Sequence, residues 1–332
     1  MTIFVFEYLD KIQDYPLKNP SPLKSESAFS RLYSPATLYE PVDYTMNQGG
    51  KKIRFNITLL ACKAFTDDVA KAELAAKAIE MFHNFTLVHD DVIDRADTRR
   101  GQPAVHKKWD LNTALLSGDV MLILAYEYLT QIQHPNLSQI LQKFTKTARE
   151  VCEGQQMDID FENLPAVQMD SYIDMISKKT AVLVGAAMYI GSKCGGAEEA
   201  DALSLYQFGL HLGIAFQIRD DILDCYGDKV KVGKTKGGDI LQGKKTILYI
   251  RTWNTLSPED QVKFEKLYYG SDSDKINQVL EWFIKSDAKS YALEMEKNYF
   301  RKAINHLKQA NIPEHKMHDL FDFANELMDR DH

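Results

Sequence analysis

Apolar residues recur at helical spacing along most of the chain after Gly49-Gly50. Segment after segment is apolar at positions i, i+3, i+4 and i+7, as in a helix that buries one face. These segments are 53–65, 72–94, 113–133, 138–160, 168–192, 199–225, 244–254, 258–269, 273–285, 288–310 and 314–329. No stretch alternates apolar and polar residues for long, and no Asn-Gly hairpin signal occurs. The pattern therefore predicts an all-α protein.

Helix-breaking residues separate these segments. They lie at Gly101-Gln102-Pro103, at His134-Pro135-Asn136, at Gly195-Gly196 and in the glycine-rich stretch 227–243. Prolines among serines and lysines in 16–35 predict an irregular lead-in, so residues 1–35 are expected to be irregular or short-helical. Glycine and proline nowhere concentrate between two self-contained halves. We therefore expect one domain over residues 1–332.

Composition and charge exclude several classes of protein. Apolar residues make up 45% of the chain and charged residues 26%, which is ordinary globular composition. A net charge of −7 argues against nucleic acid as the main partner. The four cysteines are scattered without a C-x-x-C pair, as in a reduced intracellular protein. We see no signal peptide and no run of about 18 apolar residues, and so expect a cytoplasmic protein without a membrane span.

Two acidic runs repeat one spacing at the ends of apolar helices. LVHDDVIDRADTRRG (87–101) and FQIRDDILD (216–224) each hold two adjacent aspartates and a third three residues later. On a helix the first and third aspartates lie one turn apart, roughly 5–6 Å between Cβ atoms. Carboxylates this close repel each other unless cations pair with them, and oxygen ligands without cysteine suit Mg²⁺ better than zinc.

Basic residues stand beside glycine or threonine at several separate points. These are GGKKIR (49–54), RRG (99–101), KKT (178–180) and GKTK (233–236). Arginine forks and lysine ammonium groups are the usual partners of phosphate oxygens. Any one of these signals alone is more often a solvated surface, and His83 alone is more often a core histidine. Together with two acidic runs, however, they predict a substrate with diphosphate charge.

A nucleotide-binding loop is the other interpretation of the basic stretch near residue 230. GDKVKVGKT has one residue too many between Gly227 and Gly233 for a phosphate loop, and it follows a helical pattern instead of a strand. We therefore reject a nucleotide-binding loop.

The motifs, taken in order, resemble those of the trans-isoprenyl diphosphate synthases, the polyprenyl synthetase family that includes farnesyl and geranylgeranyl diphosphate synthases. The resemblance covers residues from about 40 to 250. It is carried by GGKKIR (49–54), HNFTLVHDDVIDRADTRRG (83–101), EGQQMD (153–158), KKTA (178–181), FQIRDDILD (216–224), GKTKGGD (233–239) and GKKT (243–246). Each motif is weak by itself, but their shared order is highly specific.

The resemblance implies the isoprenoid synthase fold, a helical bundle around a deep central cavity, usually as a homodimer. It implies Mg²⁺, commonly three ions per active site, and a trans-prenyltransferase that joins isopentenyl diphosphate head-to-tail to an allylic diphosphate. By resemblance the direct metal ligands are Asp90, Asp94 and Asp220, with Asp91, Asp221 and Asp224 as direct or water-mediated supports. The two aspartate helices are expected to face each other across the cavity.

The resemblance also assigns the substrate contacts. Isopentenyl diphosphate is expected at Lys51, Arg54, His83 and Arg100. The allylic diphosphate is expected at Arg99, Lys179, Thr180, Gln217, Lys234 and Lys244. Gln155 and Asp158 are expected to order the first aspartate motif without binding substrate or metal themselves. Where the family usually has GGKRLRP, this chain has Lys52 for an arginine and Phe55 for the proline. We expect altered packing there and unchanged chemistry.

Product length is expected to depend on side chains just before the first aspartate motif. In the family, bulky residues there form a floor that stops chain growth. This chain has Phe82, Phe85 and the small Thr86, and no insertion within DDVID. This arrangement favours a C20 geranylgeranyl product over a C15 farnesyl product, although Phe85 also suits a plain core position.

Other protein classes share single features with this chain. A class I terpene cyclase also uses a first D-D-x-x-D helix with Mg²⁺, but it would not need GGKKIR or the second aspartate run. A head-to-head squalene or phytoene synthase would prefer D-x-x-x-D motifs. A non-catalytic synthase subunit would usually have lost one metal motif. A purely structural helical protein is disfavoured because unneutralised carboxylates would destabilise it.

Overall fold

The computed structural model describes residues 28–227 and 237–329 of the chain. The described residues confirm the all-α prediction, since helices occupy nearly all of the segments expected to be helical. Contacts between Cα atoms divide the chain into two units. One comprises the described residues up to Gln48 with Val88–Gly118, and the other comprises Gly49–Leu87 with the described residues from Asp119 onward. The prediction of one domain over 1–332 stays a prediction.

The smaller unit is built around a helix end and a short hairpin. It contains α2 (Phe29–Leu32), α3 (Ala36–Asn47), the last residues of α5 (Glu73–Ile93), α6 (Val105–Lys108) and the start of α7 (Leu111–Thr130). Strands β1 (Thr98–Arg99) and β2 (Gln102–Pro103) pair antiparallel, with Arg99 opposite Gln102. Arg100 and Gly101 join them with φ of 52° and 73°, the positive values of a type I′ turn. The sequence had not indicated this hairpin.

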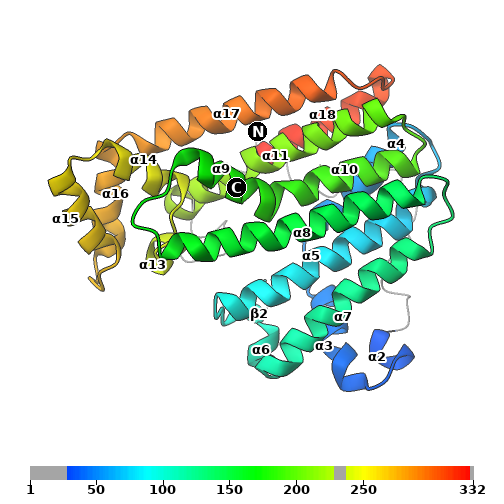
Figure 1. Cartoon of the computed structure of the whole chain (residues 1–332), viewed down its shortest axis with the longest axis horizontal. Coiled ribbons are helices and arrows are strands. Elements are labelled where there is room, and N and C mark those ends of the chain that lie inside the picture. Colours follow the sequence, from blue (N-terminus) through cyan, green and yellow to red (C-terminus); the bar gives the residue numbers. More distant parts are fainter. Residues whose placement is uncertain (1–27, 228–236, 330–332) are drawn as a thin grey trace, which may run out of the picture. The chain divides into compact units, whose positions relative to one another are not determined.

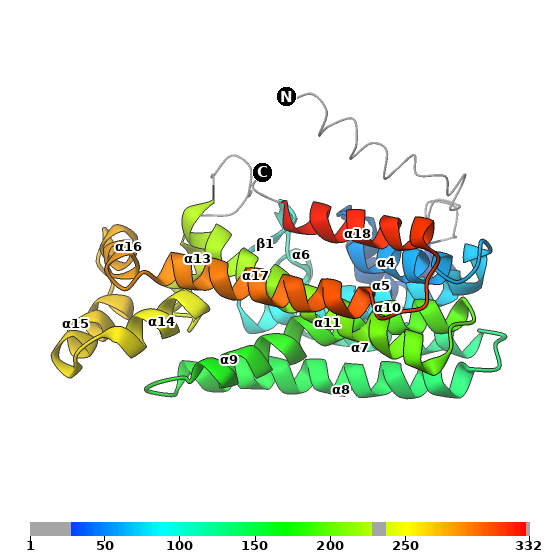
Figure 2. The ribbon, with the colours of Figure 1, turned by 90° about the horizontal axis from the view of Figure 1, so that it is seen from above.

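The larger unit is a layered bundle of long helices, in which α8 (Leu137–Glu162), α10 (Val182–Cys194), α11 (Glu199–Tyr226) and α17 (Ala288–Leu307) lie side by side (Figures 1 and 2). Helix α11 packs against both α10 and α17, and α4 (Ile53–Lys63) packs against α10. Every residue of α10 is buried, as expected of a helix that is apolar on all sides. This helix is therefore the centre of the bundle.

The remaining elements of the larger unit complete the bundle. A 3-10 turn (Val69–Ala72) precedes α5, and α18 (Glu314–Met328) packs against α4 and α11. The helices α13 (Gly238–Gln242), α14 (Ile247–Thr255), α15 (Pro258–Tyr268) and α16 (Lys275–Lys285) gather at one end, coloured yellow in Figure 1. There Tyr249, Phe264 and Tyr268 form an aromatic cluster with ring centroids 4.6–5.5 Å apart.

One predicted helix is interrupted. The apolar pattern predicts continuous helix over 168–192, but the structure has α9 (Met169–Ile176), a π-helical turn (Ser177–Ala181) and α10. Periodicity cannot reveal such a turn because one extra residue shifts the pattern only slightly. The turn carries Lys179 and Thr180, two of the predicted substrate contacts.

Within the part of the chain that the structure describes, no helix combines the length and the apolar character needed to cross a bilayer. The cytoplasmic location expected from the sequence stays a prediction.

Candidate functional site

The first aspartate motif ends helix α5. The backbone N–H of Asp94 donates to the carbonyl of Asp90 at 2.8 Å, so these two residues are one helical turn apart. Asp94 is exposed and Asp90 is half-buried, whereas Asp91 between them is only 3% exposed. The carboxylate of Asp91 accepts hydrogen bonds from Arg99, one of them from Nε at 2.9 Å. The middle aspartate is therefore held by an arginine of the neighbouring hairpin.

Burial and charge act in opposite directions on Asp91. Burial raises the pKa of the Asp91 carboxyl, and the hydrogen bond and charge of Arg99 oppose that rise. Arg99 itself is held by its place in β1, directly before the two-residue turn. Arg100 occupies the turn and is exposed. The hairpin thus turns one arginine onto the motif and presents the other to solvent.

The second aspartate motif lies near the end of α11 and has the same burial order. Asp220 and Asp224 are half-buried, and Asp221 is 5% exposed. Both oxygens of Asp221 accept hydrogen bonds. Tyr172 Oη donates to Oδ2 at 2.6 Å, and Gln217 Nε2 donates to Oδ1 at 3.1 Å. The backbone N–H of Ile247 lies 3.4 Å from Oδ2.

Asp221 therefore joins three elements, α9, α11 and the start of α14. Burial raises the pKa of its carboxyl, the charge of Asp239 raises it further, and the Tyr172 hydrogen bond opposes both. Asp224 Oδ2 also accepts from the backbone N–H of Asp239 at 3.1 Å. Sequence reasoning missed Tyr172, because 49 residues separate it from Asp221 and no local pattern links them.

Three predicted residues of the allylic site, Lys179, Thr180 and Gln217, have defined contacts in the larger unit. Lys179 Nζ donates to Asp158 Oδ2 at 2.6 Å, and the role expected of Asp158 in ordering the first aspartate motif stays a prediction. Thr180 Oγ1 donates to Gln217 Oε1 at 3.0 Å. Gln217 therefore connects Thr180 with Asp221. These contacts place the π-helical turn and the second aspartate motif in one hydrogen-bonded network.

Lys244 belongs to a loop that is fixed through its backbone. Its N–H donates to the carbonyl of Asp239 at 3.0 Å, and its carbonyl accepts from Tyr268 Oη at 2.6 Å. The adjacent Lys245 is buried and donates to the carbonyl of Phe161 at 2.7 Å, at the end of α8. Of the two lysines, Lys245 has a structural role, and Lys244 is half-exposed.

Arg54 and His83 lie together, as the predicted isopentenyl diphosphate site requires. Arg54 Nη1 is 2.9 Å from His83 Nε2. The preceding loop bends sharply, with positive φ at Gly49, Gly50 and Lys52, and this bend starts α4. Lys51 is exposed at this bend. Phe55 is buried, which is consistent with a packing role for the residue that replaces the usual proline.

The side chains predicted to limit product length form part of an aromatic cluster. The rings of Phe82 and Phe85 are 5.4 Å apart, and Phe82 meets Phe144 of α8 edge-to-face at 5.4 Å. Phe144 in turn meets Tyr126 of α7 at 5.0 Å. Thr86, which has a small side chain, donates through Oγ1 to the carbonyl of His83 at 2.7 Å. Phe144 and Tyr126 were not foreseen because they belong to other helices.

The donor set of each motif fits Mg²⁺. Each motif contributes aspartate oxygens from one helix turn, and among the described residues no group of three His, Cys, Asp or Glu side chains forms an all-protein metal cage. Mg²⁺ is usually bound by one or two carboxylates, with substrate phosphates and water completing its coordination. Carboxylate pairs without sulfur ligands are therefore the expected arrangement for this ion.

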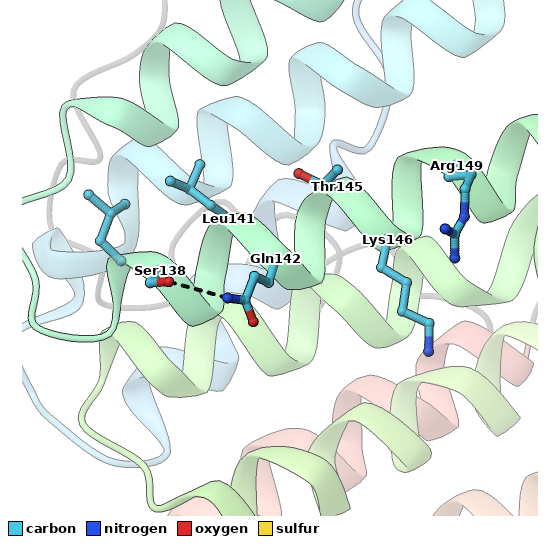
Figure 3. Close-up of a pocket in the computed structure, with 7 residues that line it drawn as sticks. Ser138, Leu141, Gln142, Thr145, Lys146 and Arg149 are labelled. Atoms are coloured by element: carbon cyan, nitrogen blue, oxygen red, sulfur yellow. Dashed lines mark hydrogen bonds between the residues drawn. The ribbon is translucent and has the colours of Figure 1, made fainter.

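Two predictions about the site are not tested by the contacts described above. Lys234 falls outside the described residues. The two aspartate motifs belong to different units. Their expected arrangement, facing each other across a cavity, stays a prediction. A shallow pocket on the outer face of α8 holds none of the predicted site residues (Figure 3). Its lining consists of Leu137, Ser138, Leu141, Gln142, Thr145, Lys146 and Arg149.

Comparison with known proteins supports the assignment at three levels. The family model for polyprenyl synthetases matches residues 35–284. A geranylgeranyl pyrophosphate synthase of Geoglobus acetivorans is 36% identical over 301 residues, which are 90% of this chain and 92% of the relative. The crystal structure of a geranylgeranyl pyrophosphate synthetase from Pyrococcus horikoshii Ot3 superposes with a TM-score of 0.85 at 34% identity, covering 90% of this chain and 91% of that one.

A further solved structure carries ligands. A polyprenyl synthase from Caulobacter crescentus CB15, complexed with calcium and isoprenyl diphosphate, superposes with a TM-score of 0.83 at 26% identity and covers 92% of each chain. An all-α bundle with these acidic and basic groups defines an enzyme class that acts on diphosphates. The chain belongs to the polyprenyl synthetase family. This confirms the family and the enzyme class, trans-prenyltransferase, that the motifs predicted.

Proposed function

We propose that the enzyme condenses isopentenyl diphosphate head-to-tail with an allylic diphosphate and releases an all-trans C20 geranylgeranyl diphosphate. Relatives named geranylgeranyl synthases cover most of the chain and support this product. The structural observation that carries the proposal is the burial order of the two motifs, in which the middle aspartate is held by protein donors and the outer two are more exposed. A C15 farnesyl product is the alternative.

The two diphosphate substrates are proposed to bind where basic side chains are held by defined contacts. Isopentenyl diphosphate binds at Arg54 and His83, which lie 2.9 Å apart, with Lys51 and Arg100. The diphosphate of the allylic substrate binds at Lys179, Thr180 and Gln217, which the Asp158 and Asp221 contacts orient. Arg99, Lys244 and Lys234 complete that site. Cations held at defined positions recognise diphosphate oxygens without reorganising during the reaction.

Mg²⁺ is the proposed metal, with three ions per active site. Asp90, Asp94 and Asp220 would hold it directly. Asp91, Asp221 and Asp224, whose carboxylates already accept hydrogen bonds from protein donors, would act as direct or water-mediated supports. When bound, Mg²⁺ acts as a Lewis acid that stabilises negative charge on the departing diphosphate.

The reaction begins when the allylic C–O bond breaks and leaves an allylic cation. The ammonium of Lys179 and the guanidinium of Arg99 stabilise the charge that develops on the departing diphosphate. The double bond of isopentenyl diphosphate, held by Arg54 and His83, then forms the new C–C bond. The freed diphosphate takes a proton from the new carbocation, which regenerates an allylic double bond, and leaves as pyrophosphate. The aromatic side chains Phe82 and Phe85 keep water from the cation.

A homodimer is the proposed assembly. Helix α7 exposes large apolar side chains, of which Leu116 is 58% and Ile123 is 63% exposed, and their seven-residue spacing places them on one face. Leu111 and Leu115 of the same helix are 52% and 38% exposed. A second copy of this chain is the proposed occupant of that face. Light scattering of the wild type and of Leu116→Glu tests this, with a monomeric wild type as the contrary result.

The activity is tested by incubation with radiolabelled isopentenyl diphosphate, Mg²⁺ and each allylic primer in turn, followed by separation of the products by length. We expect elongation that ends at C20. Absence of elongation with every primer would overturn the proposed function, and a C15 end point would select the alternative.

The product stop is tested by Phe85→Ala. Five helical residues between Phe85 and Asp90 correspond to roughly 7.5 Å of depth, and removing the ring deepens the pocket. We expect longer products by mass spectrometry. Phe264→Ala, in the aromatic cluster at the far end of the larger unit, is the control and should leave the length unchanged. An unchanged profile for Phe85→Ala rejects Phe85 as the stop.

A further inference from the structure

The π-helical turn Ser177–Ala181 is an unfavourable backbone conformation within the proposed allylic diphosphate site. π-Helical turns are rare, occur mostly as single interruptions of α-helices, and persist where the surrounding structure holds them. This one separates α9 from α10 and carries Lys179 and Thr180. Contacts from neighbouring elements must therefore stabilise this π-helical turn.

Helix α8 contacts the backbone of this turn through a glycine. A Cβ atom added to Gly154 would lie 2.2 Å from the backbone nitrogen of Lys179 and 2.7 Å from the carbonyl carbon of Lys178. These are backbone atoms, which cannot rotate away as a flexible side chain can. Only glycine allows α8 to approach the turn this closely.

Helix α11 contacts the same turn through a second glycine. A Cβ atom added to Gly213 would lie 2.7 Å from Cα and 2.9 Å from Cβ of Ala181. Two helices far apart in sequence thus each meet the turn without a side chain in between. Direct contacts with α8 and α11 therefore fix the position of the π-helical turn.

Each of these helices also supplies a polar partner one turn after its glycine. Asp158, four residues after Gly154, accepts from Lys179 Nζ at 2.6 Å. Gln217, four residues after Gly213, accepts from Thr180 Oγ1 at 3.0 Å. Residues four apart lie on one face of a helix, so each glycine and its partner face the turn together. A shift of the turn would displace both contacts.

We propose that Gly154 and Gly213 are positioning residues, which seat the π-helical turn so that Lys179 and Thr180 point at the diphosphate of the allylic substrate. This inference rests on the proposed function. It predicts that crowding the turn weakens recognition of the allylic diphosphate and leaves that of isopentenyl diphosphate unchanged.

Gly213→Ala and Gly209→Ala form a matched pair for the test. Gly209 lies one turn earlier on α11, and its added Cβ would meet the Val184 carbonyl at 2.8 Å and the Gly185 Cα at 2.9 Å, which is similar crowding against α10. We expect Gly213→Ala to raise the KM for the allylic diphosphate about tenfold, since a displacement of about 1 Å at a site costs up to a hundredfold. Gly209→Ala should leave both KM values unchanged.

Amide hydrogen exchange in the ligand-free protein gives a second measurement that does not depend on activity. Gly213→Ala should speed exchange at residues 177–181, and Gly209→Ala should not. Gly154→Ala should reproduce the Gly213→Ala result from the α8 side. Equal effects of Gly213→Ala and Gly209→Ala on the allylic KM, or no effect of either, overturn the proposal.

A milder pair covers the case in which Gly213→Ala does not fold. Ala181→Gly removes the methyl group that contacts Gly213, and Ala186→Gly is the control at a fully buried position of α10. We expect Ala181→Gly to raise the allylic KM about threefold, a smaller effect because the seat is loosened and not blocked. An unchanged allylic KM in Ala181→Gly overturns the proposal. Wild type that elongates no primer would instead refute the proposed function, so the two failures are distinct.

Discussion

The two aspartate motifs have the same spacing and the same burial order, but they are supported in different ways. Asp91 is held by Arg99, eight residues away, through a charged pair in which the arginine side chain is 31% exposed. Asp221 is held by neutral donors, the hydroxyl of Tyr172, the amide of Gln217 and the backbone of Ile247. The first motif is thus supported locally, and the second by elements brought together only by folding.

The difference shows that a repeated motif does not imply a repeated environment. The end of α5, followed by a hairpin that carries Arg99 and has a two-residue turn, suffices to hold Asp91. Asp221 requires α9, α11 and the start of α14 to be packed together. The second motif should therefore respond to damage to the bundle, and the first to changes in charge and salt.

The largest expected effect is common to both motifs. Asp90→Asn and Asp220→Asn keep the side-chain volume and remove a metal-binding charge. Each should lower turnover by about a thousandfold, about 4 kcal/mol of barrier. Steady-state kinetics at saturating Mg²⁺ measure this. Near-normal turnover in either variant would show that the two motifs are not equivalent in catalysis.

Removal of the middle aspartates should separate the motifs by stability. Asp221→Ala leaves the buried Tyr172 hydroxyl and the Ile247 N–H without their acceptor, and should cost about 3 kcal/mol of unfolding free energy. Asp91→Ala leaves Arg99, which reaches water, and should cost about 1 kcal/mol. Urea unfolding gives both values. Equal losses would contradict the distinction between long-range and local support.

Tyr172→Phe removes one donor from Asp221 and keeps the ring. The expected loss is about 1 kcal/mol of unfolding free energy, the usual contribution of one buried hydrogen bond. Tyr126→Phe is the control, since its hydroxyl bonds to Thr145 in an exposed position and should contribute close to nothing. A loss in Tyr172→Phe no larger than in the control would remove Tyr172 from the network.

The smallest expected effect concerns salt. A double-mutant cycle between Asp91 and Arg99 should give a coupling energy that falls by a few tenths of a kcal/mol as NaCl rises from about 0.1 to 1 M, where the screening length shortens from about 10 to 3 Å. The cycle between Tyr172 and Asp221 should keep its coupling energy, because the tyrosine is neutral. The same salt response in both cycles would refute the contrast.

Local sequence signals predicted most helices well. Helix α15 was expected over 258–269 and spans Pro258–Tyr268, because Ser257 caps its N-terminus by accepting from the Asp260 N–H at 3.2 Å and Pro258 suits the first turn. The hairpin was missed because its turn uses Arg100-Gly101 instead of Asn-Gly. Helix α3 was also not foreseen, since Pro41 lies inside it.

The candidate site was predictable only in part. The contacts Arg54–His83, Lys179–Asp158 and Thr180–Gln217 join residues that motif resemblance had already named. Tyr172 and Phe144 were not named, and Gly154 was quoted only within EGQQMD without a role, because the roles of all three depend on which helix lies beside them. A side chain that acts through a neighbour leaves no pattern in its own segment.

The sequence by itself determined that this protein is helical, where most of its helices begin and end, and which charged residues mark a diphosphate enzyme. These properties follow from periodicity, capping and residue type, which act within a few residues of the chain. Only the tertiary structure decided that Asp91 and Asp221 are held by different kinds of donor and that a π-helical turn carries Lys179. Such features arise when distant helices touch, and the closeness of that contact depends on packing that no single segment encodes.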